Sequence, residues 1–294
     1  MNILVTIDTL DFSIFSQYKD LYDEILDSLL VYPNIQKIIF RLCYPSWSAI
    51  SKFSEKAQIN LSIRDAQMRD PEWHILDEFL QNFMSNTIVS LDYSGNKIQS
   101  GFCTFINNSS NLTKLTLNGC FSFSENNIEI FSRYLSSNQN LEELYVIGTD
   151  THYLSSSITF LFKALKTTIF IHVLKISHNM IGNHIFNLIL DLITSNLNLM
   201  DIYFDFNGIS DPQSLRQFIF KMTSLDRKVN IHFPTSDISS MVKNKFIQES
   251  EVEKIKENLF RIDDNNSEEK SISNSNFSCE RKKFTSIKTS VDSD

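Results

Sequence analysis

Apolar and polar residues recur along the chain at fixed offsets that predict a series of short strands. In the segment 171–182, IHVLKISHNMIG, apolar residues occupy the first, fourth, sixth and eleventh positions, and an asparagine occupies the ninth. The segments 199–210 and 88–98 have the same spacing, and the segments 112–120 and 141–149 keep it as far as the ninth position. Alternate residues of a strand face the same side, so each segment predicts a strand with one buried face.

The five segments begin at residues 88, 112, 141, 171 and 199, so the unit repeats every 24 to 30 residues. Their ninth positions are Asn96, Cys120, Thr149, Asn179 and Asn207. This pattern resembles the leucine-rich repeat signature, in which spaced hydrophobic residues precede an Asn or a Cys. The length of the unit leaves room for a helix and is similar to the ribonuclease-inhibitor-like subfamily. The resemblance implies an α/β solenoid with a curved parallel sheet on the concave face and helices on the convex face.

The recurring ninth residue has a structural explanation. The chain must turn after each strand, and the turn leaves backbone N–H and C=O groups inside the coil that need hydrogen-bond partners. A buried Asn carries two donors and an acceptor, while a Cys or a Thr satisfies such groups in part. We therefore expect these five residues to form an internal ladder rather than to bind a ligand.

Amphipathic helices are predicted between the strands. Five segments place apolar residues at helical spacing: 71–84, 124–137, 157–166, 185–193 and 211–222. An Asp-Pro pair stands at the start of the first and the last, and proline favours the first turn of a helix. In the first helix the spacing predicts a buried stripe of Ile75, Phe79, Leu80 and Phe83.

The repeat pattern weakens towards both ends of the chain. Two segments, 35–43 and 58–66, keep part of the spacing, and the last unit has Lys228 where the first apolar residue belongs. Atypical terminal units are typical of solenoid caps. We expect an N-terminal cap at 1–34, a solenoid of about six to seven units at 35–238, a C-terminal helix at 239–264 and a disordered tail at 265–294, where Ser, Asn and charged residues dominate.

Composition and charge narrow the range of functions. A chain of 294 residues that is 42% hydrophobic buries a substantial core, and its net charge of −8 disfavours a nucleic-acid partner. We expect no membrane partner, because no apolar run reaches the roughly 18 residues that a membrane helix requires. The N-terminus lacks the basic stretch of a signal peptide. The four Cys form no Cys-x-x-Cys pair, so we expect reduced thiols in a cytoplasmic protein.

The sequence gives no positive indication of catalysis. The six His residues form no metal-ligating motif with Cys or Glu, and no nucleophile elbow, phosphate-binding loop or kinase signature is present. The segment SGNKIQSG has a glycine-rich character, but its two glycines fall at turns that the repeat already requires. We therefore expect neither an enzyme nor a bound cofactor or metal.

The concave face of the expected sheet is the candidate binding surface, because solenoids usually bind through it. The outward position at the centre of each strand reads Ile39, Ser62, Asp92, Thr116, Tyr145, Lys175 and Tyr203. Exposed Tyr beside charged residues is typical of binding hot spots. We predict that a partner contacts Tyr145, Ile147, Lys175, His178, Tyr203 and Asp205. The alternative is that Tyr145 and Tyr203 only pack across adjacent strands.

Two classes of function remain open at this point. A leucine-rich repeat without an attached effector domain implies a noncatalytic scaffold for protein–protein interaction, with a partner that the sequence does not name. Within that class, the SHNMIG and SGNKI segments are similar to repeats of CARMIL-type regulators of actin capping protein. The alternative class is a regulator of a small GTPase, since the Ran GTPase-activating family shares this repeat type.

Overall fold

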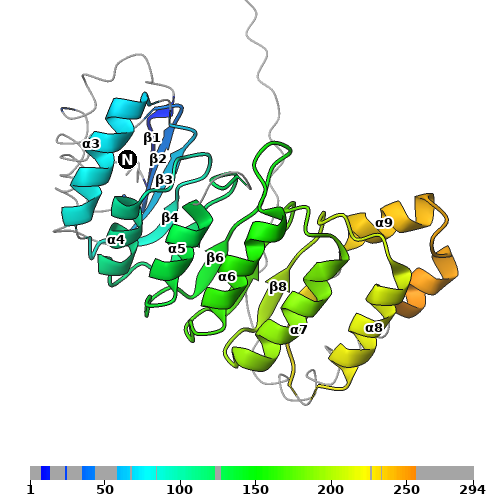
Figure 1. Cartoon of the computed structure of the whole chain (residues 1–294). Helices are drawn as coiled ribbons and strands as arrows, with labels where there is room; N and C mark the ends of the chain where they lie inside the picture. The colour runs from blue at the N-terminus through cyan, green and yellow to red at the C-terminus, as the bar shows by residue number, and fades with distance from the viewer. Residues whose placement is uncertain are drawn as a thin grey trace, which may run out of the picture.

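The chain folds as an open parallel sheet with helices along one side, which we describe from a computed structural model (Figure 1). The structure describes residues 8–13, 24, 35–43, 58–66, 68–83, 85–122, 127–225, 227–232 and 234–255. The expected tail at 265–294 lies outside these residues. So does most of the expected N-terminal cap at 1–34.

Strands and helices alternate through the described part of the chain. The strands are β1 (Thr9–Asp11), β2 (Lys37–Arg41), β3 (Ile59–Arg64), β4 (Ile88–Asp92), β5 (Lys114–Thr116), β6 (Glu143–Tyr145), β7 (Val173–Lys175), β8 (Asp201–Tyr203) and β9 (Asn230–His232). The helices are α3 (Asp70–Asn82), α4 (Ser100–Asn108), α5 (Asn127–Leu135), α6 (Ile158–Leu165), α7 (Ile185–Ser195), α8 (Pro212–Thr223) and α9 (Thr235–Lys243), with short 3₁₀ turns η4 (Ser155–Ser157) and η5 (Gly182–His184) before α6 and α7.

The strands lie side by side in the order of the sequence, and each pair is parallel. Their register aligns equivalent repeat positions, so one row of apolar residues runs through the middle of the sheet. This row is Leu10, Ile38, Leu61, Leu91, Leu115, Leu144, Leu174, Ile202 and Ile231. From Ile38 to Ile202 its members are at most 2% exposed. Residues at the same position of the predicted repeat therefore lie side by side in neighbouring strands. The expected α/β solenoid is confirmed.

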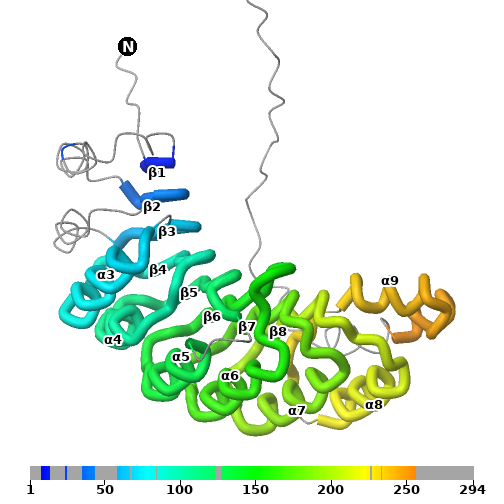
Figure 2. The backbone as a smooth tube through the Cα atoms, turned by 45° about the horizontal axis from the view of Figure 1, so that its top comes forward, coloured from blue at the N-terminus to red at the C-terminus, as the bar shows by residue number. Residues whose placement is uncertain are grey.

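Helices α3 to α8 lie along one side of the sheet, and none of them covers the other side (Figure 2). Figure 2 shows the row of strands bending in an arc, with α3 to α8 along its outer side. The helix-free inner face therefore corresponds to the predicted concave face. Helix α7 illustrates the packing, since Ile185, Ile189 and Leu192 recur at helical spacing and are fully buried against the sheet.

The buried face of α3 matches the predicted one only in part, because Leu80 and Phe83 are buried as predicted but Ile75 and Phe79 are not. Ile75 is 67% exposed and Phe79 is 36% exposed, whereas Trp73, Leu76, Asp77 and Leu80 face the core. The Asp77 carboxylate accepts hydrogen bonds from two backbone N–H groups in the first turn of α4, at 2.7 and 3.3 Å. Burying this carboxylate caps the next helix, and that contact sets the rotation of α3.

The described sheet extends beyond the predicted solenoid at its N-terminal end. Strands β2 to β8 correspond to the seven repeats and β9 to the atypical last unit, all within the expected range 35–238, while β1 adds a strand from within residues 1–34. The C-terminal region contains two helical segments, because α9 begins at Thr235, before the expected boundary at residue 238, and a second segment covers 249–255. Residues 256–264 of the expected helix lie outside the described part.

Candidate functional site: the inner face of the sheet

The ninth repeat position forms hydrogen-bonded rungs between neighbouring units. Asn179 is 1% exposed, and its side-chain amide donates to Val146 of the preceding unit at 2.7 Å and to Ile176 of its own unit at 3.1 Å. Its side-chain oxygen accepts from the Leu154 N–H at 3.1 Å, and its own N–H donates to Asn207 at 2.9 Å. These bonds account for the asparagine structurally, because they pair backbone groups inside the turns.

The rungs at Asn96 and Cys120 also donate to backbone carbonyl groups, through different side chains. Asn96 donates to Ile63 of the preceding unit at 2.8 Å. Burial raises the pKa of Cys120 to about 12, so the thiol stays protonated and donates to the Tyr93 carbonyl at 3.2 Å. Thr149 is different, since its hydroxyl accepts from the His152 N–H within its own loop. The ladder is therefore interrupted at Thr149, where the turn closes on itself.

The last rung is an aspartate that the sequence pattern missed. Asp237 in α9 accepts hydrogen bonds from the backbone N–H groups of Asn207, Gly208 and Ile209 at 2.9 to 3.3 Å. Burial raises the pKa of this carboxyl group above its ordinary value. The repeat offsets place the ninth position of the last unit at Ser236, one residue earlier, so the position alone does not find Asp237.

The C-terminal half of the inner face carries a continuous row of stacked side chains. The Lys175 ammonium lies 4.4 Å from the ring centroid of Tyr145 on one side and 4.4 Å from that of Tyr203 on the other. The Tyr203 ring in turn stacks on His232, with centroids 3.5 Å apart. We call Tyr145, Lys175, Tyr203 and His232 the aromatic row. Cation–π contacts and stacking hold it in one arrangement.

Charged groups fix both ends of the aromatic row. Lys114 lies over the Tyr145 ring and forms a salt bridge with Glu143 at 2.7 Å, and the Tyr145 hydroxyl donates to Glu143 at 2.6 Å. Burial opposes ionisation of Glu143, but the hydrogen bonds from Lys114 and Tyr145 hold its pKa below the ordinary value. At the other end, His232 lies 3.2 Å from an oxygen of Asp201. The row thus has a Lys114–Glu143 pair at one edge and Asp201 at the other.

The predicted contact residues do not all lie in this row. Tyr145, Lys175 and Tyr203 are brought together as described. Ile147 is half-buried at the strand end. His178 lies in the turn after β7 with a φ of +58° and stacks on Phe206 at 4.2 Å. The Asp205 carboxylate accepts from the first backbone N–H groups of α9. Asp205 thus stabilises the start of α9, whether or not it also contacts a partner.

His232 is the member of the row that sequence reasoning missed, although Lys228 marked its unit as atypical. The feature that identifies His232 is its repeat position: β9 pairs with β8 so that His232 lies beside Tyr203, at the same position of the repeat.

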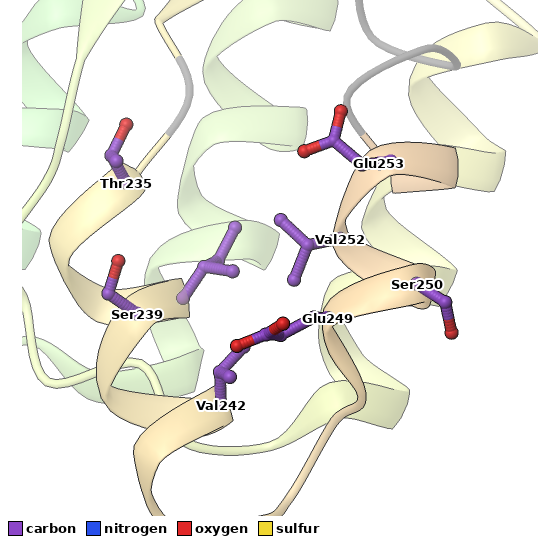
Figure 3. Close-up of a pocket in the computed structure, with 8 residues that line it drawn as sticks. Thr235, Ser239, Val242, Glu249, Ser250, Val252 and Glu253 are labelled. Atoms are coloured by element: carbon purple, nitrogen blue, oxygen red, sulfur yellow. The ribbon is translucent and has the colours of Figure 1, made fainter.

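A hollow also lies at the C-terminal end of the fold, between α9 and the helical segment 249–255. It has a volume of about 640 Å³. Figure 3 shows Val252 and Glu253 on one side and Thr235 and Ser239 on the other, while Ser250 points away. The chain continues directly from this hollow into residues 256–294, which lie outside the described part.

Among the residues that the structure describes, no three His, Cys, Asp or Glu side chains lie close enough together to hold a metal ion. None of the helices in the described ranges combines the length and the apolar character that a bilayer crossing requires.

Comparisons with known proteins do not identify a family for the chain. No protein-family model matches the sequence, and no curated protein matches it. Among solved structures, the chain is similar to a Bacteroides fragilis protein determined by a structural genomics consortium. The two are 17% identical with a TM-score of 0.49, over 79% of this chain and 75% of the other.

Proposed function

We propose that the chain is a noncatalytic scaffold of the leucine-rich repeat type, similar to ribonuclease-inhibitor-like proteins, which binds a protein partner through the inner face of its sheet. The repeat offsets support the assignment of the type, because the Asn and Cys rungs stand where that signature has them. The uncovered inner face supports the assignment of the surface, because such faces are the usual binding surfaces of solenoids.

The aromatic row is the observation that carries this proposal. Tyr145 and Tyr203 are half-exposed and are held by Lys175 before any partner arrives. Side chains that are already ordered lose less conformational entropy on binding, and Tyr beside cationic groups is typical of binding hot spots. Packing across strands and binding are thus compatible roles for the same tyrosines.

We further propose a reducing compartment such as the cytoplasm. Cys43, Cys103 and Cys120, the cysteines in the described part of the chain, are buried free thiols. Disulfides are rare in reducing compartments, where thiols of this kind persist.

The proposal is tested by quantitative affinity capture from native cytosol. The double variant Tyr145→Ser/Tyr203→Ser removes both rings of the row and leaves the buried strand positions unchanged. The matched control is Phe160→Ser/Phe220→Ser, because these phenylalanines are 42% and 74% exposed on the outer helices α6 and α8. Circular dichroism on all three proteins verifies equal folding.

The expected result is a protein that binds wild type and the outer-face control but is lost from the inner-face variant. Binding of that purified protein is then expected to weaken by more than about tenfold in the inner-face variant, the effect of losing one hot-spot side chain. Capture of the same proteins by all three would place the site elsewhere, and the absence of any specific protein would argue against a scaffold.

A further inference from the structure

The N-terminal half of the inner face is hollowed where the aromatic row ends. A hollow of about 500 Å³ extends across β2 to β5 and is bounded by Lys37 at one end and Tyr145 at the other. The register explains the shape, because Ser62 and Thr116 stand in the row of the sheet that Tyr145 occupies further along. Small side chains at these positions leave the space open. We call this space the polar hollow.

Two hydroxyl side chains with little exposed surface, those of Ser62 and Thr116, line the polar hollow. Ser62 is 6% exposed and Thr116 is 9% exposed, and both line the hollow. Within the described ranges, neither side chain makes a hydrogen bond. Neither hydroxyl oxygen is among the fully buried unpartnered atoms of the described residues, so both are open to the hollow and can donate to a ligand atom there in place of water.

The charge of the polar hollow is opposite to that of the whole chain. Lys37, Arg64 and Lys114 line it, together with one carboxylate, that of Asp92. Arg64 pairs with this carboxylate through a hydrogen bond of 2.6 Å, and Lys114 pairs with Glu143 beside the hollow at 2.7 Å. Lys37 is exposed, and no carboxylate of the described residues pairs with it. With the two other cations paired, Lys37 gives the hollow an excess of positive charge on a chain of net charge −8, and this excess attracts anionic groups.

We propose that the polar hollow binds an extended acidic segment of a partner protein. Its donors are spread over β2, β3 and β5 rather than gathered at one point. Neighbouring strands lie about 4.8 Å apart, so the donors span about 14 Å. This spread matches several Asp or Glu carboxylates along one peptide better than a single phosphate group. The inference rests on the proposed function, since it gives the partner's chemistry at the same face.

The test uses fluorescein-labelled peptides of six glutamates and of six glutamines, titrated with the whole chain and followed by fluorescence polarisation. The glutamate peptide is expected to bind, more weakly as salt is raised, and the glutamine peptide is not. Lys37→Gln is expected to weaken binding about tenfold, the effect of one charge-assisted hydrogen bond. Ser62→Val, which removes a donor and fills the hollow, is expected to weaken it as well.

The matched control is Lys163→Gln, the same change at an exposed position on the outer helix α6. It is expected to leave peptide binding unchanged. Equal effects of Lys37→Gln and Lys163→Gln, or no binding of the glutamate peptide, would overturn the proposal. Lys37 is exposed, so its variant remains informative even if Ser62→Val does not fold. Displacement of the peptide by inorganic phosphate at a lower concentration than by free glutamate would also overturn it, in favour of a phosphate ligand.

The experiment separates this inference from the proposed function. A captured partner that depends on the aromatic row, with no binding of the glutamate peptide, would refute the acidic segment alone. Binding of the glutamate peptide that depends on Lys37, with no captured protein, would support the hollow and refute the scaffold.

Discussion

Asn179 connects three successive units of the solenoid through single hydrogen bonds. Its side chain pairs Val146 and Leu154 in the unit before it, and its backbone N–H pairs with Asn207 in the unit after it. Truncation leaves these groups unsatisfied in the interior, where water does not replace the lost partner. The position therefore bears on the stability of the coil rather than on binding.

We expect Asn179→Ala to lower the free energy of unfolding by about 3 kcal/mol, because more than one buried backbone group loses its partner. The measurement is urea unfolding followed by circular dichroism. Asn187→Ala, at an exposed position of α7, is the matched control and is expected to stay within about 0.5 kcal/mol of wild type. Equal stabilities of the two variants would contradict the structural role of the rung.

Gly148 is required for a different reason, because the neighbouring unit leaves no space for a side chain. A Cβ atom there would lie 1.9 Å from the backbone oxygen of His178. At Gly182 nothing lies within 4 Å of such an atom, but the φ of +69° is unfavourable for other residues. A side chain at Gly148 would thus overlap with backbone atoms, whereas a side chain at Gly182 would cause only conformational strain.

We expect Gly148→Ala to cost about 3 kcal/mol, since a backbone atom must move to accept the methyl group. Gly182→Ala is expected to cost only about 1 kcal/mol, the strain of a left-handed conformation. Thermal unfolding of both variants measures the difference. If Gly182→Ala were the less stable protein, overlap at Gly148 would not be the dominant effect.

At the scale of single elements, helix α8 begins with a complete N-terminal cap. The Asp211 carboxylate accepts from the N–H groups of Gln213 and Ser214 at 3.0 and 3.1 Å, and Pro212 occupies the first turn. The hydroxyl of Ser214 and the N–H of Gln213 hold the pKa of Asp211 below its ordinary value. The ionised carboxylate also interacts favourably with the N-terminal end of the helix dipole.

This cap predicts a specific dependence of stability on pH. A carboxyl group whose pKa is lower in the folded state binds fewer protons there than in the unfolded state, so it stabilises the fold above its ordinary pKa near 3.8. Its contribution is lost as pH falls from that value through the lowered one. Asp211→Asn keeps a capping side chain but does not titrate. We expect its melting temperature to lie below that of wild type at pH 7 and to converge with it in acid; a constant gap would exclude the carboxylate as the cause.

The order and phase of the elements were predictable because they depend on local periodicity. Every full unit has equivalents of Leu174 and Asn179 at the fourth and ninth positions of the repeat. The same repeat therefore predicts both the pairing of the strands and the positions of the rungs. The rotation of α3 was not predictable, since Ile75 and Phe79 have helical spacing but Asp77 is buried to cap α4. That contact joins two units, and no pattern within one helix contains it.

The candidate site was predictable only in part, for the same reason. The outward strand positions follow from alternation, so Tyr145, Lys175 and Tyr203 were found. Their stacking through the lysine depends on the alignment of three strands. The polar hollow depends on the absence of bulk at Ser62 and Thr116, which a search for aromatic and charged residues does not notice.

At the scale of the whole molecule, the described elements form an array in which each unit packs mainly on its neighbours. Contacts between elements run mainly between neighbouring strands and neighbouring helices. Stability in such an array is approximately the sum of the units and of their interfaces. A destabilising substitution in a central unit is therefore expected to alter the cooperativity of unfolding, whereas the same substitution in the last unit is expected to affect that end alone.

Leu174 and Ile231 test this difference because they occupy the same row of the sheet. Leu174 is fully buried between two units, and Leu174→Ala is expected to cost about 2–5 kcal/mol. The weakened interface lets the units on either side unfold separately, so the apparent slope of the urea transition is expected to decrease. Ile231 is half-buried in the last strand, and Ile231→Ala is expected to affect only the C-terminal end, with a small change in midpoint. A single steep transition in Leu174→Ala, with the slope of wild type, would mean that the array unfolds as one cooperative unit despite its chain of nearest-neighbour contacts.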